Sequence, residues 1–259
     1  MSRADRPQRA AQLLLNLRRS GPRPPSLPDE LAPRTQQEAY EVQRELTRAR
    51  GTPVGGWKVA MSGPGEGTSA PIFADELYRS PAAVDCVIGE RLGLEPEVAF
   101  TLRRDLPTLA DGVLYTREEL IEAIDAAYAA IEIVVSRFRS HDGAAPLARL
   151  ADNISNGGLV LSAPCRDWHS LDLATVPLRL TLHSPDGKHT EHASHGGHPL
   201  GDPLAPLLWL VNDRAQHRGG IRAGEAITTG SYAGLRYAKR GARVVVEFAG
   251  LGTAVLQVR

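Results

Sequence analysis

The spacing of apolar residues near the start of the chain predicts two helices. Within residues 6–19 apolar side chains recur every three or four positions, with arginine and glutamine between them, which is the period of one helix face. The proline-rich run 21–25 then ends that helix, because proline lacks a backbone donor. A second helix is expected to begin at Thr35 and end near Gly51, since Thr35 and Glu38 fit a capping box.

From residue 55 onward the pattern changes to short apolar runs broken by glycine, proline and aspartate, which is typical of strands. Residues 56–60 predict a strand, and the glycine-rich run 61–69 predicts a loop. Thr116 and Glu119 form a capping box that predicts a helix whose apolar stripe continues to Tyr128. The remaining expected elements are strands at 131–135, 158–162, 176–183, 226–229, 244–248 and 254–258 and a helix at 203–212. Helices first and strands later indicate an α+β protein.

Two carboxylates, Glu95 and Glu97, lie in the otherwise apolar run 94–100. Side chains alternate across a strand, so both carboxylates point to the same face. Like charges on a face that becomes core are costly unless a cation lies between them. Carboxylate oxygens favour Mg²⁺ or Mn²⁺ over zinc, because no cysteine or nearby histidine offers softer ligation. A solvated edge strand is the alternative, and Pro96 would be tolerated there.

Composition and charge narrow the class of protein. The 259 residues carry 30 basic and 30 acidic side chains, so net charge is zero, which does not favour nucleic acid or an anionic membrane surface as a partner and permits self-association. Two cysteines exclude a disulfide framework and favour the cytoplasm. No apolar stretch approaches the length of a membrane span. We therefore expect a soluble, cytoplasmic protein.

Other motifs with possible chemistry are weaker. The histidine-rich run 188–198 lacks the cysteine partners and helical spacing of common zinc sites, so a polar loop is the preferred interpretation. The chain contains neither the Gly-x-Ser-x-Gly elbow of serine hydrolases nor a dinucleotide fingerprint.

Several segments, in their order and spacing, resemble the 2-keto-4-pentenoate hydratase branch of the fumarylacetoacetate hydrolase superfamily. The resemblance extends from about Gln37 to the C-terminus. The matching segments are residues 56–59, 73–78, 94–100, 104–107, 131–133 with Ser136 and Arg137, 151–155, 197–200 and 229–231.

The resemblance implies that Glu95, Glu97 and Glu132 are the ligands of a divalent metal, Mg²⁺ or Mn²⁺. It also implies a mixed β-roll catalytic domain over residues 76–259, preceded by a helical segment and lead-in strand over residues 1–75. Members of the family assemble into homo-oligomers, so self-association is expected here as well.

Family members act on small 2-oxo or 2-enol acids, so the expected reaction is hydration of a 2-hydroxy-2,4-dienoate to a 4-hydroxy-2-oxo acid. Lys58 is the first candidate for proton transfer, because burial in an apolar strand would lower its pKa into a useful range. Asp75 is the second, because the family places a catalytic acid in this segment; a turn or cap role is its alternative.

Three further residues are candidates for substrate binding. Ser155 and Thr229 are expected to hydrogen-bond the substrate, although Ser155 could instead satisfy backbone groups in the turn after Asp152. His198, in the family motif Gly-His-Pro-Leu, is expected to shape the pocket and lead into the following helix.

Three departures from the family pattern leave the substrate open. The loop after Lys58 is short, residues 201–203 are inserted, and Val134-Val135 replaces a segment that often carries aspartate. The closest rival activity is decarboxylation of the 4-oxalocrotonate type, in a sister branch with the same metal ligands. A carbon–carbon hydrolase of acylpyruvates and a non-catalytic binding paralogue that keeps the fold also stay open.

Overall fold

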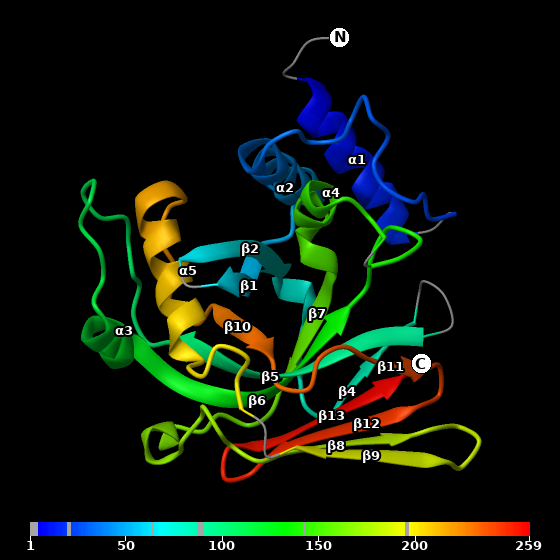
Figure 1. Cartoon of the computed structure of the whole chain (residues 1–259), viewed down its shortest axis with the longest axis vertical. Helices are drawn as coiled ribbons and strands as arrows, with labels where there is room; N and C mark the ends of the chain where they lie inside the picture. Colours follow the sequence, from blue (N-terminus) through cyan, green and yellow to red (C-terminus); the bar gives the residue numbers. More distant parts are fainter. Residues whose placement is uncertain (1–4, 20–21, 64, 87–90, 142, 195–196) are drawn as a thin grey trace.

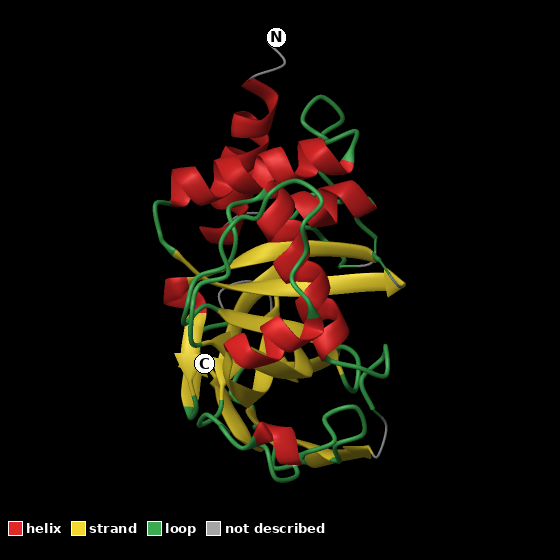
Figure 2. Cartoon of the chain, turned by 90° about the vertical axis from the view of Figure 1, so that its left-hand side faces the viewer, coloured by secondary structure: helices red, strands yellow, loops and turns green. Residues whose placement is uncertain are grey.

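The computed structural model describes residues 5–19, 22–63, 65–86, 91–141, 143–194 and 197–259. Two β-sheets and a layer of helices make up the molecule (Figure 1). Helices α1 (Asp5–Arg19), α2 (Gln36–Arg50) and α4 (Pro146–Ala151) lie above the larger sheet in Figure 1, and the smaller sheet lies below it. Figure 2 shows the same arrangement from the side, with most helices in the upper half.

The helices are α1 (Asp5–Arg19), α2 (Gln36–Arg50), α3 (Arg117–Ala123), α4 (Pro146–Ala151) and α5 (Leu204–His217), with short 3₁₀ turns η1 (Ala74–Glu76), η2 (Asn153–Ser155) and η3 (Trp168–Ser170). Helices α1, α2 and α4 share one apolar cluster, which includes Leu14, Leu46 and Phe138. None of the described helices is long and apolar enough to span a membrane.

The larger sheet has eight strands in the order β2-β1-β10-β5-β6-β7-β3, and β11 also pairs with β5. Its strands are β1 (Val54–Gly63), β2 (Glu66–Phe73), β3 (Leu77–Arg79), β5 (Arg91–Leu102), β6 (Ile124–Val134), β7 (Asn156–Leu161), β10 (Ala226–Ser231) and β11 (Arg236–Lys239). The sheet is mixed, because β1 pairs with β10 in parallel and β5 pairs with β6 antiparallel.

The smaller sheet has five strands in the order β4-β13-β12-β8-β9. They are β4 (Ala82–Val84), β8 (Leu178–His183), β9 (His189–Ser194), β12 (Arg243–Phe248) and β13 (Gly252–Val258). Its apolar side chains join those on the outer face of the larger sheet in the main core, which includes Phe100, Leu207 and Phe248. The expected α+β class with curled, mixed sheets is confirmed. The expected domain boundary at residue 75 falls inside the larger sheet, since β1 and β2 precede it and β3 follows it.

Helix starts follow the capping signals in the sequence. At α3 the capping box is complete, because Thr116 accepts from the Glu119 N–H and the Glu119 carboxylate accepts from the Thr116 N–H. At α2 only half of it forms: Thr35 accepts from the Glu38 N–H, whereas the Glu38 carboxylate accepts from the Arg34 N–H, 2.7 Å away.

The expectation that the helix and its apolar stripe continue to Tyr128 is wrong. Helix α3 ends at Ala123, and residues from Ile124 onward form β6, paired with β5 on one side and β7 on the other. Nearly every side chain of β6 is buried. A strand buried on both faces is continuously apolar, so its pattern resembles that of a buried helix.

Three further local expectations need correction. The described part of residues 61–69 is mostly the ends of β1 and β2, which pair as a hairpin, and residue 64 lies outside the described residues. Strand pairing keeps this glycine-rich stretch extended. The histidine-rich run is mainly strand β9 rather than a loop, and residues 195–196 lie outside the described residues. The strand with Glu95 and Glu97 is central, not an edge.

Candidate active site

Four ionisable side chains gather at the concave face of the larger sheet. Glu95 and Glu97 come from β5, Glu132 is the direct cross-strand partner of Glu95 on β6, and Lys58 comes from β1. One oxygen from each of the three carboxylates lies within 4.8 Å of the others. Glu97, Glu132 and Lys58 are buried, and Glu95 is half-buried.

Pro96 lies between the two glutamates because β5 changes partner there. Glu97 is opposite Ser231 of β10, and Leu94 is opposite Arg236 of β11. The register of Pro96 falls between these two pairings and is matched to no residue of β10 or β11, so the missing backbone donor of proline leaves no ladder hydrogen bond unmade on this side of β5. The Pro96 carbonyl accepts from the Tyr232 N–H at 2.9 Å. Because side chains alternate along β5, whose register with β6 is unbroken from Gly93 to Thr101, Glu95 and Glu97 lie on the same face of a central strand.

Neighbouring groups orient the carboxylates. The Glu132 Oε1 atom lies 2.7 Å from Lys58 Nζ and accepts from Asn156 Nδ2 at 3.0 Å. Glu97 accepts from the Thr228 hydroxyl and from the Gly230 N–H, the latter at 2.8 Å. Glu132 Oε2 is buried and has no hydrogen-bond partner among the described residues. That unsatisfied oxygen is available to a ligand.

Burial and mutual repulsion shape the protonation of this cluster. Burial raises the pKa of Glu95 and raises that of Glu97 well above its usual value, with nearby carboxylates adding to the effect. For Lys58 burial alone would lower the pKa, but Glu132, Glu95 and Glu97 outweigh it and the pKa is raised. The expectation of a lowered Lys58 pKa is therefore wrong, because burial was considered without the carboxylates.

The residues present fit a hard divalent cation. Three carboxylates and one ammonium leave two uncompensated negative charges, which one divalent cation would neutralise. The donor set consists of oxygens, and one buried oxygen lacks a partner among the described residues. Oxygen ligands of this kind suit Mg²⁺ or Mn²⁺. Glu95, Glu97 and Glu132 are the residues that would hold it.

His198 and Thr229, both predicted to lie at the substrate site, contact each other. His198 is buried, its Nε2 lies 2.9 Å from the Thr229 carbonyl, and its Nδ1 accepts from the Leu200 N–H at 3.2 Å. Nδ1 is thus unprotonated, and Nε2–H is the donor to Thr229. Burial lowers the pKa of His198, in keeping with a neutral ring.

The structure brings Thr228, rather than Thr229, to the carboxylates. The Thr229 hydroxyl donates to the Val98 carbonyl at 3.1 Å, whereas the Thr228 hydroxyl donates to Glu97. Alternation along β10 allows only one of two successive side chains to face Glu97. The sequence contains this signal, but it becomes usable only once the pairing of β10 with β5 is known.

Ser155 lies in a turn of unusual backbone geometry close to Lys58. Asn153, Ile154 and Ser155 have φ angles of 50°, 50° and 60°, and the Ile154 carbonyl accepts from Lys58 Nζ at 3.3 Å. The Ser155 hydroxyl is 3.1 Å from Nδ1 of His141, a residue that the sequence did not single out. Ser155 therefore lies near the predicted site, with its side chain engaged by His141.

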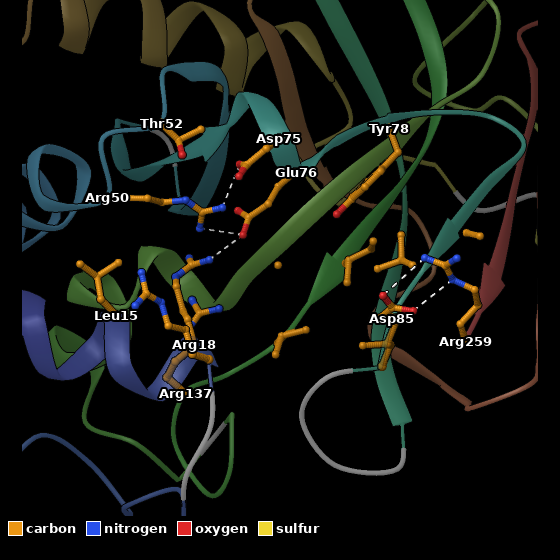
Figure 3. Close-up of a pocket in the computed structure, with 17 residues that line it drawn as sticks. Leu15, Arg18, Arg50, Thr52, Asp75, Glu76, Tyr78, Asp85, Arg137 and Arg259 are labelled. Carbon is orange, nitrogen blue, oxygen red and sulfur yellow. Dashed lines mark hydrogen bonds and ion pairs between the residues drawn. The ribbon is translucent and has the colours of Figure 1, made fainter.

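Asp75 lies outside this cluster. It is exposed, belongs to η1, and pairs with Arg50 at 2.8 Å. The neighbouring Glu76 pairs with Arg18 and Arg50, each at 2.9 Å. These residues line a cavity of about 520 Å³, shown in Figure 3. The described hydrogen bonds and ion pairs of Asp75 include neither Lys58 nor the three carboxylates.

Curated relatives resemble the chain over most of its length. The chain is 28% identical over 237 residues to a 2-keto-4-pentenoate hydratase of Paraburkholderia xenovorans, covering 86% of this chain and 84% of that protein. It is 30% identical over 259 residues to 2-keto-4-pentenoate hydratase 2 of Dechloromonas aromatica, covering 95% of each. It is 31% identical over 262 residues to the TodF product hydratase of Pseudomonas putida, covering 95% and 92%.

The fold is also that of a solved enzyme. The 4-oxalocrotonate decarboxylase of Pseudomonas putida G7, complexed with magnesium and adipate, superposes with a TM-score of 0.78 at 20% identity, covering 100% of this chain and 99% of that chain. The family model described as fumarylacetoacetate (FAA) hydrolase C-terminal matches residues 32–259. The chain therefore belongs to the fumarylacetoacetate hydrolase family.

Proposed function

We propose that this protein is a divalent-metal-dependent hydratase that adds water to a 2-hydroxy-2,4-dienoate and gives a 4-hydroxy-2-oxo acid. The observation that carries the proposal is the buried group of three carboxylates with a single lysine against it. The names of the curated relatives, which are hydratases of this substrate class, support it.

The carboxylates would hold Mg²⁺ or Mn²⁺, which when bound supplies a Lewis acid for the 2-oxo group of the substrate. Asn156 orients Glu132, and Thr228 with the Gly230 N–H orients Glu97. These contacts fix the carboxylates before the ligand arrives, so little reorganisation accompanies binding.

Lys58 is the proposed proton-transfer group. Its ion pair with Glu132, 2.7 Å away, favours the ammonium form, which suits delivery of a proton to C5 of the dienoate. The 2-hydroxyl proton leaves as the 2-oxo group forms, and water then adds with its hydroxyl group on C4 and its proton on C3, so that the product contains one molecule of water more than the substrate. The ammonium is held by Glu132 and the Ile154 carbonyl, which defines the direction of its remaining N–H.

The other predicted residues have indirect or untested parts in this proposal. His198 and Thr229 stabilise the end of β10 that carries Thr228 and Gly230. Ser155 is proposed to bind the substrate carboxylate with the hydrogen-bonding capacity that His141 does not use. A catalytic role for Asp75 stays a prediction, as does assembly into a homo-oligomer, which light scattering tests.

The testing experiment follows the ultraviolet absorbance of freshly generated 2-hydroxypenta-2,4-dienoate with Mg²⁺, with Mn²⁺ and with EDTA. Metal-dependent loss of the dienol absorbance, with 4-hydroxy-2-oxopentanoate as product, is the expected result. No loss with folded, metal-loaded protein would contradict the proposal for this substrate. A 2-oxo diacid assayed in parallel tests decarboxylation, the runner-up activity.

A further inference from the structure

Arg137 lies just after β6 and is almost completely buried, with 1% of its surface exposed. Its backbone N–H donates to Asp152 Oδ2 at 3.1 Å, and its Nε donates to Asp152 Oδ1. Its Nη2 donates to the Asp152 carbonyl at 2.6 Å, and its Nη1 donates to the Asn156 carbonyl at 2.8 Å. One guanidinium therefore holds both ends of the segment 152–156.

The segment between these two ends has a backbone that non-glycine residues rarely adopt. Asn153, Ile154 and Ser155 are successive residues in the left-handed region. Such conformations persist only where surrounding contacts fix them, and they are concentrated at functional sites. The hydrogen bonds from Arg137 to both ends of the segment are contacts of that kind.

The same segment contacts two groups of the active site. The Ile154 carbonyl accepts from Lys58 Nζ at 3.3 Å, and Asn156 Nδ2 donates to Glu132 Oε1 at 3.0 Å. A change in the path of this backbone would move both contacts, and with them the position of the ammonium relative to the carboxylates.

We propose that Arg137 is a positioning residue for the reaction, which fixes Lys58 and Glu132 by clamping both ends of the segment 152–156 and so holding residues 153–155 in their left-handed conformation. The inference rests on the proposed function, in which Lys58 transfers a proton.

Arg137 acts through the segment and not on the substrate. Its side chain lines the cavity of Figure 3, next to Arg18. Ile133 and Val135 line that cavity too. Because side chains alternate along a strand, Ile133 points to the opposite face of β6 from Glu132. The cavity that Arg137 and Ile133 line is therefore on the other side of this strand from the Glu132 carboxylate.

The main variant is Arg137→Lys, which keeps a cation beside Asp152 but cannot bond both ends of the segment. We expect kcat to fall about 100-fold, since a displacement of roughly 1 Å has that effect on a catalytic group. KM should change as well, because Ser155, which is proposed to bind the substrate carboxylate, lies in the same segment, and a fall in kcat larger than the change in KM marks the positioning of Lys58. Arg259→Lys is the matched control: Arg259 lines the same cavity and pairs with Asp85, and kcat should be unchanged.

A second measurement follows Lys58 without activity. The chain has three lysines, Lys58, Lys188 and Lys239, so protein labelled with ¹³C at lysine Cε gives few resonances. The Lys58 resonance is the one absent from Lys58→Met. It should shift in Arg137→Lys and stay in place in Arg259→Lys.

The outcomes separate the inference from the proposed function. If wild-type protein fails to convert the dienoate, the proposed function fails, and the Lys58 resonance still decides whether Arg137 positions that side chain. If wild type is active and Arg137→Lys keeps its kcat and Lys58 resonance, the inference fails and the function stands. Should Arg137→Lys not fold, as judged by thermal melting, the double variant Arg137→Gln/Asp152→Asn leaves no charge unpaired and receives the same two measurements, with the same expected and contradicting results.

Discussion

Two groups of ionised side chains in this protein have their charges balanced differently. Around the cavity of Figure 3, Asp75 and Glu76 pair with Arg50 and Arg18 at 2.8–2.9 Å, so two carboxylates meet two guanidinium groups. At the candidate active site, three carboxylates share one ammonium.

The difference indicates which group is built for a ligand. The cavity network contains its own counter-ions, and paired, hydrogen-bonded charges are tolerated in a protein interior. The active-site group has two negative charges that no described cation balances, and burial raises the pKa of Glu95 and Glu97. Charge balance, rather than the number of acidic residues, distinguishes a site that needs a cation from a network that does not.

Replacing the only cation of the active-site group should have the largest effect. Lys58→Met should lower kcat by about 10²–10⁴-fold, the usual contribution of general acid–base catalysis. Its affinity for Mn²⁺, measured by calorimetry, should stay equal or increase, because a positive charge beside the carboxylates is removed. Lys239→Met, at an exposed position, is the control. Wild-type turnover in Lys58→Met would remove this residue from the mechanism.

Removing one carboxylate should leave the protein as stable as wild type or more stable without metal, and less stable than wild type when metal is added. In EDTA, Glu97→Gln should unfold at the same or a higher urea concentration than wild type, because a buried repulsion is relieved and the amide can still accept from the Gly230 N–H. With Mg²⁺ at about 100 times its Kd, wild type should gain about 2.7 kcal/mol, and the variant should gain much less. Equal stabilisation of both proteins by Mg²⁺ would place the metal elsewhere.

A Glu→Gln change in the charge-balanced network around the cavity of Figure 3 should lower stability by the same amount with and without metal. Glu76→Gln leaves Arg18 and Arg50 without a shared carboxylate, and should destabilise the fold by about 1–3 kcal/mol. Urea titrations should show the same loss with EDTA and with Mg²⁺. Asp85→Asn, which breaks an exposed pair with Arg259, is the control, with an expected loss of at most about 1 kcal/mol. A metal-dependent loss in Glu76→Gln would contradict the separation of the two groups.

The sequence predicts the candidate site better than it predicts the local fold around it. The spacing of Glu95 and Glu97 placed both on one face of a strand, and the resemblance added Glu132, which the structure brings within reach of them. The raised pKa of Lys58 could not be derived, because it depends on a carboxylate that only the pairing of distant strands brings near.

Pairing also explains the misplaced elements. Residues 124–128 continue the helical stripe of α3 in sequence, yet they pair with β5, since tertiary contacts override a local pattern. The turn at residues 153–155 has no glycine to signal its left-handed backbone. Its conformation depends on Arg137, whose contacts with Asp152 and Asn156 no local rule predicts.

Replacing His198, whose ring is uncharged, should have the smallest effect on stability. His198 accepts from the Leu200 N–H only when neutral, and burial lowers its pKa. Because the unfolded imidazole titrates near about 6.5, the unfolded chain binds more protons below that pH. This contribution to stability is therefore present above about pH 6.5 and is lost as pH falls through that value and toward the folded pKa. His198→Gln can still donate to the Thr229 carbonyl, so its urea midpoint in EDTA should fall less between pH 8 and pH 5.5 than that of wild type. Equal falls in both proteins would show that His198 does not couple the end of β10 to pH.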